Sequence, residues 1–179
     1  PAKLISTVGA RPGDRLILTK PLGTGILATA LKGEVITEEQ MSEAILGMLT
    51  LNRQASEAMC EIGVHACTDI TGFGLLGHLL EMLGGALGAR LELAQLPLLP
   101  GAVEQIQAGI MSTMHAANVR SAGQFLEAGP SVDEARLQML FDPQTSGGLL
   151  IALPAARAQA LCDALHQSGY AAPRIIGNV

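Results

Sequence analysis

Short apolar runs alternate with segments of helical periodicity along the chain, and glycines and prolines separate them. The apolar runs, which predict strands, lie at residues 16–19, 64–70, 89–94, 149–153 and 174–179. The helical segments lie at residues 26–31, 37–61, 75–83, 102–108, 134–140 and 155–167. This alternation predicts an α/β fold in which helices are layered around a mixed sheet. Residues 110–132 show too little periodicity to be assigned.

The segment 37–61 carries the clearest helical pattern. Thr37 and Gln40 match a capping box, in which each side chain bonds to the backbone of the other residue. Apolar residues then follow at helical spacing through Met48 to Ala55. We therefore predict one continuous helix that begins at the capping box and extends to about Glu61.

Composition limits the classes of function. The 179 residues are 49% hydrophobic, 15% charged and 2% aromatic, with a formal net charge of −5. This content supports a packed core and excludes disorder. An acidic chain with few rings argues against a nucleic-acid partner, because phosphate contacts need clustered Lys and Arg and base stacking needs aromatic side chains. The most apolar stretch, residues 72–89, is interrupted by His78 and Glu81, so we expect no membrane partner.

Two other features concern the cellular location of the protein and the length of the full polypeptide. Its three cysteines form no CxxC pair, which is typical of a reducing cytosol and predicts a cytoplasmic location. The chain begins at Pro1 and ends within a predicted strand, so we expect it to be part of a longer protein.

The first motif with chemical potential is Asp69-Ile-Thr-Gly-Phe-Gly-Leu-Leu-Gly-His78. It places an acid at a strand end, followed by glycines and the start of a helix. A carboxylate there suits Mg²⁺, the glycines allow close approach of a ligand, and helix-start amides favour an anion. The motif indicates a metal–phosphate site, although a glycine-rich turn whose acid caps the helix explains the residues equally well.

The same residues contain a GxGxxG pattern, Gly72 to Gly77, with Glu92 following 20 residues after the first glycine. This spacing matches the dinucleotide-binding fingerprint and suggests a nicotinamide-dependent oxidoreductase as an alternative. Two points oppose it. Asp69 would repel a pyrophosphate unless a cation intervened, and the alternation of Arg90 and Glu92 predicts a half-solvated strand rather than a buried parallel one.

Two further motifs are Lys20-Pro-Leu-Gly-Thr-Gly25 and Asp142-Pro-Gln-Thr-Ser-Gly-Gly148. The second offers hydroxyls and backbone amides immediately before a strand, which suits a phosphate, but by itself it is better explained as a turn. Lys20 supplies one cation at a strand end, without the residue order of a P-loop.

Together and in this order, KPLGTG, DITGFGLLGH and DPQTSGG resemble the selenophosphate synthetase (selenide, water dikinase) family, within the aminoimidazole-ribonucleotide-synthetase-like superfamily. The resemblance implies an α/β/α sandwich with a mixed sheet. It implies that residues 1–179 form the C-terminal domain of a two-domain enzyme, whose N-terminal ATP-binding and catalytic domain lies outside this chain. The implied reaction converts ATP, selenide and water to selenophosphate, AMP and phosphate.

The resemblance also carries site residues. It implies that Asp69 helps to hold Mg²⁺ on the ATP phosphates. It implies a nucleotide cleft lined by Thr71, Gly72, Gly74, Asp142, Thr145 and Ser146, with Lys20 as a weaker candidate. The family's catalytic Cys or selenocysteine and its essential Lys lie upstream, so no catalytic residue is expected here and the isolated chain is expected to be inactive. The implied partners are the protein's own N-terminal domain and a second subunit, because the family forms dimers mainly through that domain. A non-catalytic scaffold that serves oligomerisation is the remaining alternative.

Overall fold

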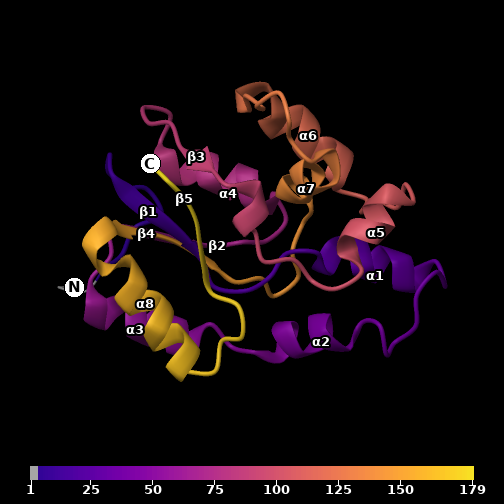
Figure 1. The fold of residues 1–179 in the computed structure, drawn as a ribbon, viewed down its shortest axis with the longest axis horizontal. Helices are drawn as coiled ribbons and strands as arrows, with labels where there is room; N and C mark the ends of the chain where they lie inside the picture. Colours follow the sequence, from indigo (N-terminus) through magenta and orange to yellow (C-terminus); the bar gives the residue numbers. More distant parts are fainter. Residues whose placement is uncertain (1–3) are drawn as a thin grey trace.

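The computed structural model describes residues 4–179 and shows helices on both faces of a five-stranded sheet (Figure 1). The strands are β1 (Asp14–Leu18), β2 (Ala66–Asp69), β3 (Arg90–Leu91), β4 (Leu149–Pro154) and β5 (Arg174–Asn178). The α-helices are α1 (Thr24–Lys32), α2 (Ser42–Leu49), α3 (Arg53–Ile62), α4 (Gly74–Leu83), α5 (Ala102–Gln107), α6 (His115–Ala122), α7 (Glu134–Gln138) and α8 (Ala155–Gln167). Three short 3₁₀ helices are η1 (Leu93–Gln95), η2 (Gly123–Phe125) and η3 (Met139–Phe141).

The strands lie in the order β2-β4-β1-β5-β3, and each of these neighbouring pairs is antiparallel. The layered α/β class is confirmed, but the prediction of a mixed sheet is wrong. The sequence was ambiguous on this point because helices cover the sheet on both faces. Strands buried on both faces have continuous apolar sequences, a pattern more often found in parallel sheets.

Alternate residues of the central strands enter two separate cores. Leu16 and Leu18 of β1 pack with α1, α4 and α5 on one face of the sheet. Ile17 packs on the opposite face with α3 and α8, which lie side by side (Figure 1). β4 alternates in the same way, since Leu150 faces the first core and Ile151 the second. The expected α/β/α sandwich is therefore confirmed.

The predicted continuous helix over residues 37–61 is wrong, because the chain breaks between α2 and α3. Two distant side chains take the carbonyl groups that a continuous helix would use. The ammonium of Lys20 donates to the carbonyl of Thr50 at 2.6 Å. The hydroxyl of Tyr170 donates to the carbonyl of Leu51 at 2.7 Å and accepts from the amide of Ala55 at 3.2 Å. The hydroxyl thus lies between two groups that would otherwise bond directly.

Other differences are local. The capping box at Thr37 and Gln40 forms, with the Thr37 amide 2.9 Å from the Gln40 side-chain oxygen, but it closes a turn that precedes α2. The strand predicted at 89–94 is only the two-residue β3, followed by η1. The unassigned residues 110–132 contain α6 and η2. Within residues 4–179, the helices are all too short or too polar to cross a membrane.

Candidate functional site

The three sequence motifs meet where β1 and β2 end and β4 begins. The side chain of Gln144 is central to this arrangement: its oxygen accepts from the amides of Gly23 and Thr24 at 3.0 and 3.2 Å and from the Thr24 hydroxyl at 3.1 Å. The backbone N–H of Gln144 donates to the carbonyl of Thr71 at 3.0 Å. Segments far apart in the sequence, 20–25, 69–74 and 142–148, therefore form one cluster of loops.

Glycines make this convergence possible. A Cβ atom on Gly147 would collide with the carbonyl oxygen of Ile70, and one on Gly25 would collide with the carbonyl oxygen of Pro143. A Cβ on Gly148 would lie 2.6 Å from the backbone nitrogen of Lys20. The glycines of the first and third motifs therefore serve close packing between loops, and their side-chain positions are not open to a ligand.

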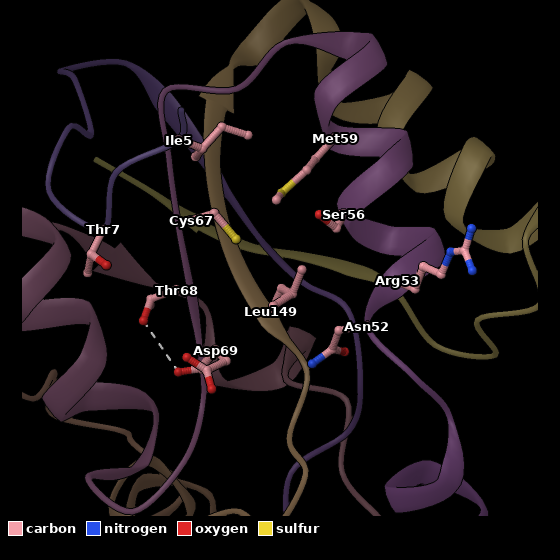
Figure 2. Close-up of a pocket in the computed structure, with 10 residues that line it drawn as sticks. All are labelled: Ile5, Thr7, Asn52, Arg53, Ser56, Met59, Cys67, Thr68, Asp69 and Leu149. Carbon is pink, nitrogen blue, oxygen red and sulfur yellow. Dashed lines mark hydrogen bonds between the residues drawn. The ribbon is translucent and has the colours of Figure 1, made fainter. Parts of the chain in front are cut away.

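Asp69 lies at the end of β2 and is exposed on the wall of an open pocket of about 520 Å³ (Figure 2). Its neighbours in this pocket include Asn52 and Arg53 at the start of α3, Cys67 of β2 and Leu149 at the start of β4. The drawn hydrogen bond from the Thr68 hydroxyl, at 3.4 Å, reaches the backbone oxygen of Asp69. Among the described residues, none donates a hydrogen bond to the Asp69 carboxylate, which leaves its oxygens available to an external ligand.

The loop after Asp69 is held in place by His78 of α4. The Thr71 amide donates to Nε2 of His78 at 3.1 Å, and the Thr71 hydroxyl lies at the same distance from this nitrogen. Burial lowers the pKa of His78, which favours the neutral ring that this contact requires. Because Nε2 accepts, the ring proton lies on Nδ1, 3.9 Å from a carboxylate oxygen of Glu81.

The glycines of this loop differ in setting. Gly72 is exposed, and nothing lies within 4 Å of a Cβ built on it. Gly74 is buried with φ +69°, and its Cβ would lie 2.8 Å from the carbonyl oxygen of Leu140. Gly72 is thus exposed and Thr71 half-buried, whereas Gly74 is buried and its positive φ is required by the backbone.

Asp142, which was predicted to line a nucleotide cleft, has a fully buried side chain in this structure. One carboxylate oxygen accepts from the Gly25 amide at 3.2 Å, in the first turn of α1, and from the Gln144 side chain at 3.0 Å. The other oxygen has no hydrogen-bond partner. Burial raises the pKa of Asp142 to about 7, and the hydrogen bonds from Gly25, Gln144 and neighbouring groups offset only part of that effect.

This raised pKa predicts a pH-dependent contribution to stability. The folded chain keeps the Asp142 proton up to about pH 7, while the unfolded chain loses it near 3.8. The folded state therefore binds more protons across this window, and the Asp142 contribution to stability falls as pH rises through it. We expect Asp142→Asn to remove the effect, so urea unfolding should show the variant gaining stability relative to the wild type between pH 5 and 7. If the difference in free energy of unfolding between the variant and the wild type stays constant over that range, the raised pKa of Asp142 is contradicted.

Lys20 is also buried, although it was considered as a phosphate ligand. Its ammonium donates to the carbonyls of Thr50 and Ser146 at 2.6 and 3.0 Å, and burial lowers its pKa. Lys20 therefore links the first motif to the α2–α3 connection and to the third motif.

We expect Lys20→Met to lower the free energy of unfolding by about 2 kcal/mol, because two carbonyl groups lose their charged donor. Lys32→Met is the matched control. Lys32 is exposed in the last turn of α1, and its loss should cost less than about 1 kcal/mol. Equal effects of the two substitutions in thermal unfolding would contradict the linking role of Lys20.

Thr145 and Ser146 are exposed at the tip of the third motif, as a ligand-binding role requires. Ser146 adopts φ +47°, a left-handed conformation, and its carbonyl faces Lys20. Neither side chain lines the pocket at Asp69. Thr71 and Gly72 do not line it either, so of the candidate site residues Asp69 alone lies on this pocket.

Sequence reasoning missed three residues that hold the site together. Gln144 lies within a recognised motif, but an amide in a turn is expected to face water. Asn118 lies in the unassigned region and donates to the carbonyls of Gly72 and Phe141, both at 2.9 Å. Asn52 donates to the carbonyl of Gly147 at 2.9 Å. Each forms contacts with residues remote in sequence, so local patterns gave no indication of them.

The dinucleotide-binding alternative is wrong on topology. That fingerprint requires a strand, helix and neighbouring parallel strand. Here β2 is an edge strand paired antiparallel with β4, and α4 leads to β3 at the opposite edge of the sheet. The glycines of residues 72–77 therefore do not open a parallel βαβ unit.

The fold and the loop cluster define a known class of domain. The family described as AIR synthase related protein, C-terminal domain, matches residues 11–179, and this chain belongs to that family. Two curated relatives named selenide, water dikinase are 47% identical over 181 residues, in Trichlorobacter lovleyi, and 41% identical over 180 residues, in Pelobacter propionicus. Each alignment covers 100% of this chain but 51% and 52% of the relative, so the chain spans about half the length of these proteins. These comparisons confirm the resemblance found in the motifs.

Solved structures with lower sequence identity share the fold. A thiamine-monophosphate kinase from Stenotrophomonas maltophilia K279a has a TM-score of 0.63 at 18% identity, covering 98% of this chain and 50% of the other. The hydrogenase maturation protein HypE in complex with ATP has a TM-score of 0.61 at 21% identity, covering 97% of this chain and 44% of the other. At these identities the likeness establishes the architecture.

Proposed function

We propose that this chain is the C-terminal domain of a selenophosphate synthetase, in which it completes a cleft for Mg²⁺ and ATP. The whole enzyme converts ATP, selenide and water to selenophosphate, AMP and phosphate. The observation that carries the proposal is the exposed Asp69 carboxylate at a strand end, beside a loop cluster built from three motifs that resemble this family. The names of relatives that are 37–47% identical support the same chemistry.

The residues present fit a magnesium ion. Mg²⁺ is held by one or two carboxylates together with waters and substrate phosphates, so it does not need a complete protein cage. Asp69 supplies one accessible carboxylate without a hydrogen-bond donor of its own. Across residues 4–179, no cluster of three or more His, Cys, Asp or Glu side chains suits a metal. Further carboxylate ligands therefore come from the N-terminal half in this proposal. When bound, the ion would neutralise charge on the phosphates.

The other site residues divide into those proposed to contact a ligand or the N-terminal domain and those that hold the loops in place. In the first group, Thr71 and Gly72 lie beside Asp69 and are proposed to contact phosphate oxygens. Thr145 and Ser146 offer exposed hydroxyls to the same cleft or to the N-terminal domain. Lys20, Gly74 and Asp142 act indirectly, since they hold these loops in place. The proposal also includes the protein's own N-terminal domain, a cytoplasmic homodimer formed mainly through that domain, and an isolated chain that is inactive.

Phosphorus NMR on the full-length protein tests the reaction directly. With Mg²⁺, ATP and selenide under strictly anaerobic conditions, we expect a new selenium-coupled phosphorus signal and accumulation of AMP. Omitting selenide should abolish that signal. If folded protein consumes ATP without forming a selenium-coupled product, the result supports an ATP-dependent enzyme but rejects selenide as its substrate. If it consumes no ATP at all, the phosphoryl-transfer proposal is overturned.

A further inference from the structure

Helix α2 presents an apolar surface to solvent on the side away from the core. Its inner side is anchored by Met41, Ala44 and Met48, which pack into the first hydrophobic core. On the outer side and in the connection that follows, four apolar residues are exposed, and we call them the α2 ridge. They are Ile45, Leu46, Leu49 and Leu51, with exposed fractions of 38, 64, 72 and 69%.

The ridge exposes more apolar surface in one place than isolated surface residues usually do. Three leucines that are about two-thirds exposed lie within six residues, on α2 at the periphery of the molecule and in the connection that follows it (Figure 1). Single exposed apolar side chains are normal on protein surfaces, whereas contiguous apolar patches mark interaction sites. The break between α2 and α3, fixed by Lys20 and Tyr170, places Leu51 on the surface as well.

The ridge is followed along the chain by residues that line the pocket at Asp69. Leu51 is followed directly by Asn52 and Arg53, which line that pocket (Figure 2). The carbonyl of Thr50 and the side chain of Asn52 bond to Lys20 and Gly147, so the ridge is tied to the loop cluster. A partner that covers the Asp69 pocket at Asn52 and Arg53 therefore lies against residues next in the chain to the α2 ridge.

We propose that the α2 ridge is a docking surface for the N-terminal half of the longer polypeptide. This rests on the proposed function, in which that half supplies the remaining nucleotide-binding groups. The relatives are about twice as long as this chain, and the chain matches a C-terminal domain family. The missing half is thus large enough to cover both the open pocket and the ridge.

Hydroxyl-radical footprinting of the full-length protein tests the ridge without requiring turnover. The oxidation rate of each side chain is compared between the native protein and the same protein unfolded in urea. Phe125 is the internal control, since it is 65% exposed at a distant site in η2. We expect Leu46, Leu49 and Leu51 to be protected at least tenfold and Phe125 less than threefold. Protection of the ridge equal to that of Phe125 would overturn the proposal.

Two further measurements identify the occupant. Protection that disappears on dilution, as an oligomer dissociates, would assign the ridge to a second copy and overturn the proposal. Protection that is independent of concentration supports the N-terminal half. The double substitution Leu46→Glu and Leu49→Glu should then increase oxidation of Leu51 at least fivefold, while Phe125→Glu should not change it. Because ATP is absent throughout, these results can stand even if phosphorus NMR rejects the selenide reaction.

Discussion

Replacing Asp69 by Asn in the full-length protein is expected to reduce ATP-dependent product formation by about two orders of magnitude or more. The substitution keeps the size of the side chain but removes the negative charge that holds a metal ion on the substrate phosphates. Because Asp69 is exposed and its carboxylate has no donor within the described residues, the free energy of unfolding should change by less than about 0.5 kcal/mol. Anaerobic turnover and urea unfolding, measured on the same preparation, separate the two effects.

A matched control comes from Asp163, an exposed acid of α8 outside the loop cluster. Asp163→Asn should leave turnover within about twofold of the wild type. Wild-type activity in Asp69→Asn would remove the metal role from this residue. A large loss of stability in that variant would instead show that Asp69 is a structural group.

Gly147→Ala is expected to have the largest effect on folding. The added methyl group would overlap the carbonyl oxygen of Ile70 and approach the Cβ of Gln144 to 2.9 Å. Both neighbours belong to the tightly bonded loop cluster and cannot move without breaking its hydrogen bonds. We expect a loss of about 3 kcal/mol, or a fall in Tm of roughly 6–12 °C, measured by calorimetry.

Gly72→Ala is the control for this substitution, because Gly72 lies in the neighbouring motif and a Cβ built on it meets nothing within 4 Å. Its Tm should stay within about 2 °C of the wild type. If both substitutions lower Tm equally, the loss reflects glycine content in general, and the close approach to Ile70 does not explain it.

The sequence was informative where local chemistry decides the outcome. The turn before Leu149 and the apolar run that begins there predicted β4. Asp69 was correctly predicted to lie at the end of a strand. Motif order also indicated which loops matter. These features depend on residues within a few positions of one another, so periodicity and turn chemistry are sufficient to find them.

The errors have a common physical origin in contacts between distant segments. The break at Thr50 requires Lys20 and Tyr170, and neither is visible from the helical pattern of residues 37–61. A polar residue in a glycine-rich turn is usually solvated, but Asp142 is covered by the start of α1 and by Gln144. Strand direction was missed for the same reason: a strand covered on both faces has a similar apolar pattern in either orientation.

The contacts of Gln144 also constrain how this domain can diverge. Its oxygen is shared by Gly23 and Thr24, while its nitrogen donates to both the carbonyl and the carboxylate of Asp142. The Thr24 hydroxyl also accepts from the Thr145 amide at 2.8 Å. The first and third motifs are therefore structurally coupled, and sequence changes in one require matching changes in the other. Chimaeras that exchange only one of them between distant relatives should fold poorly, and substitutions at positions 24 and 144 should covary.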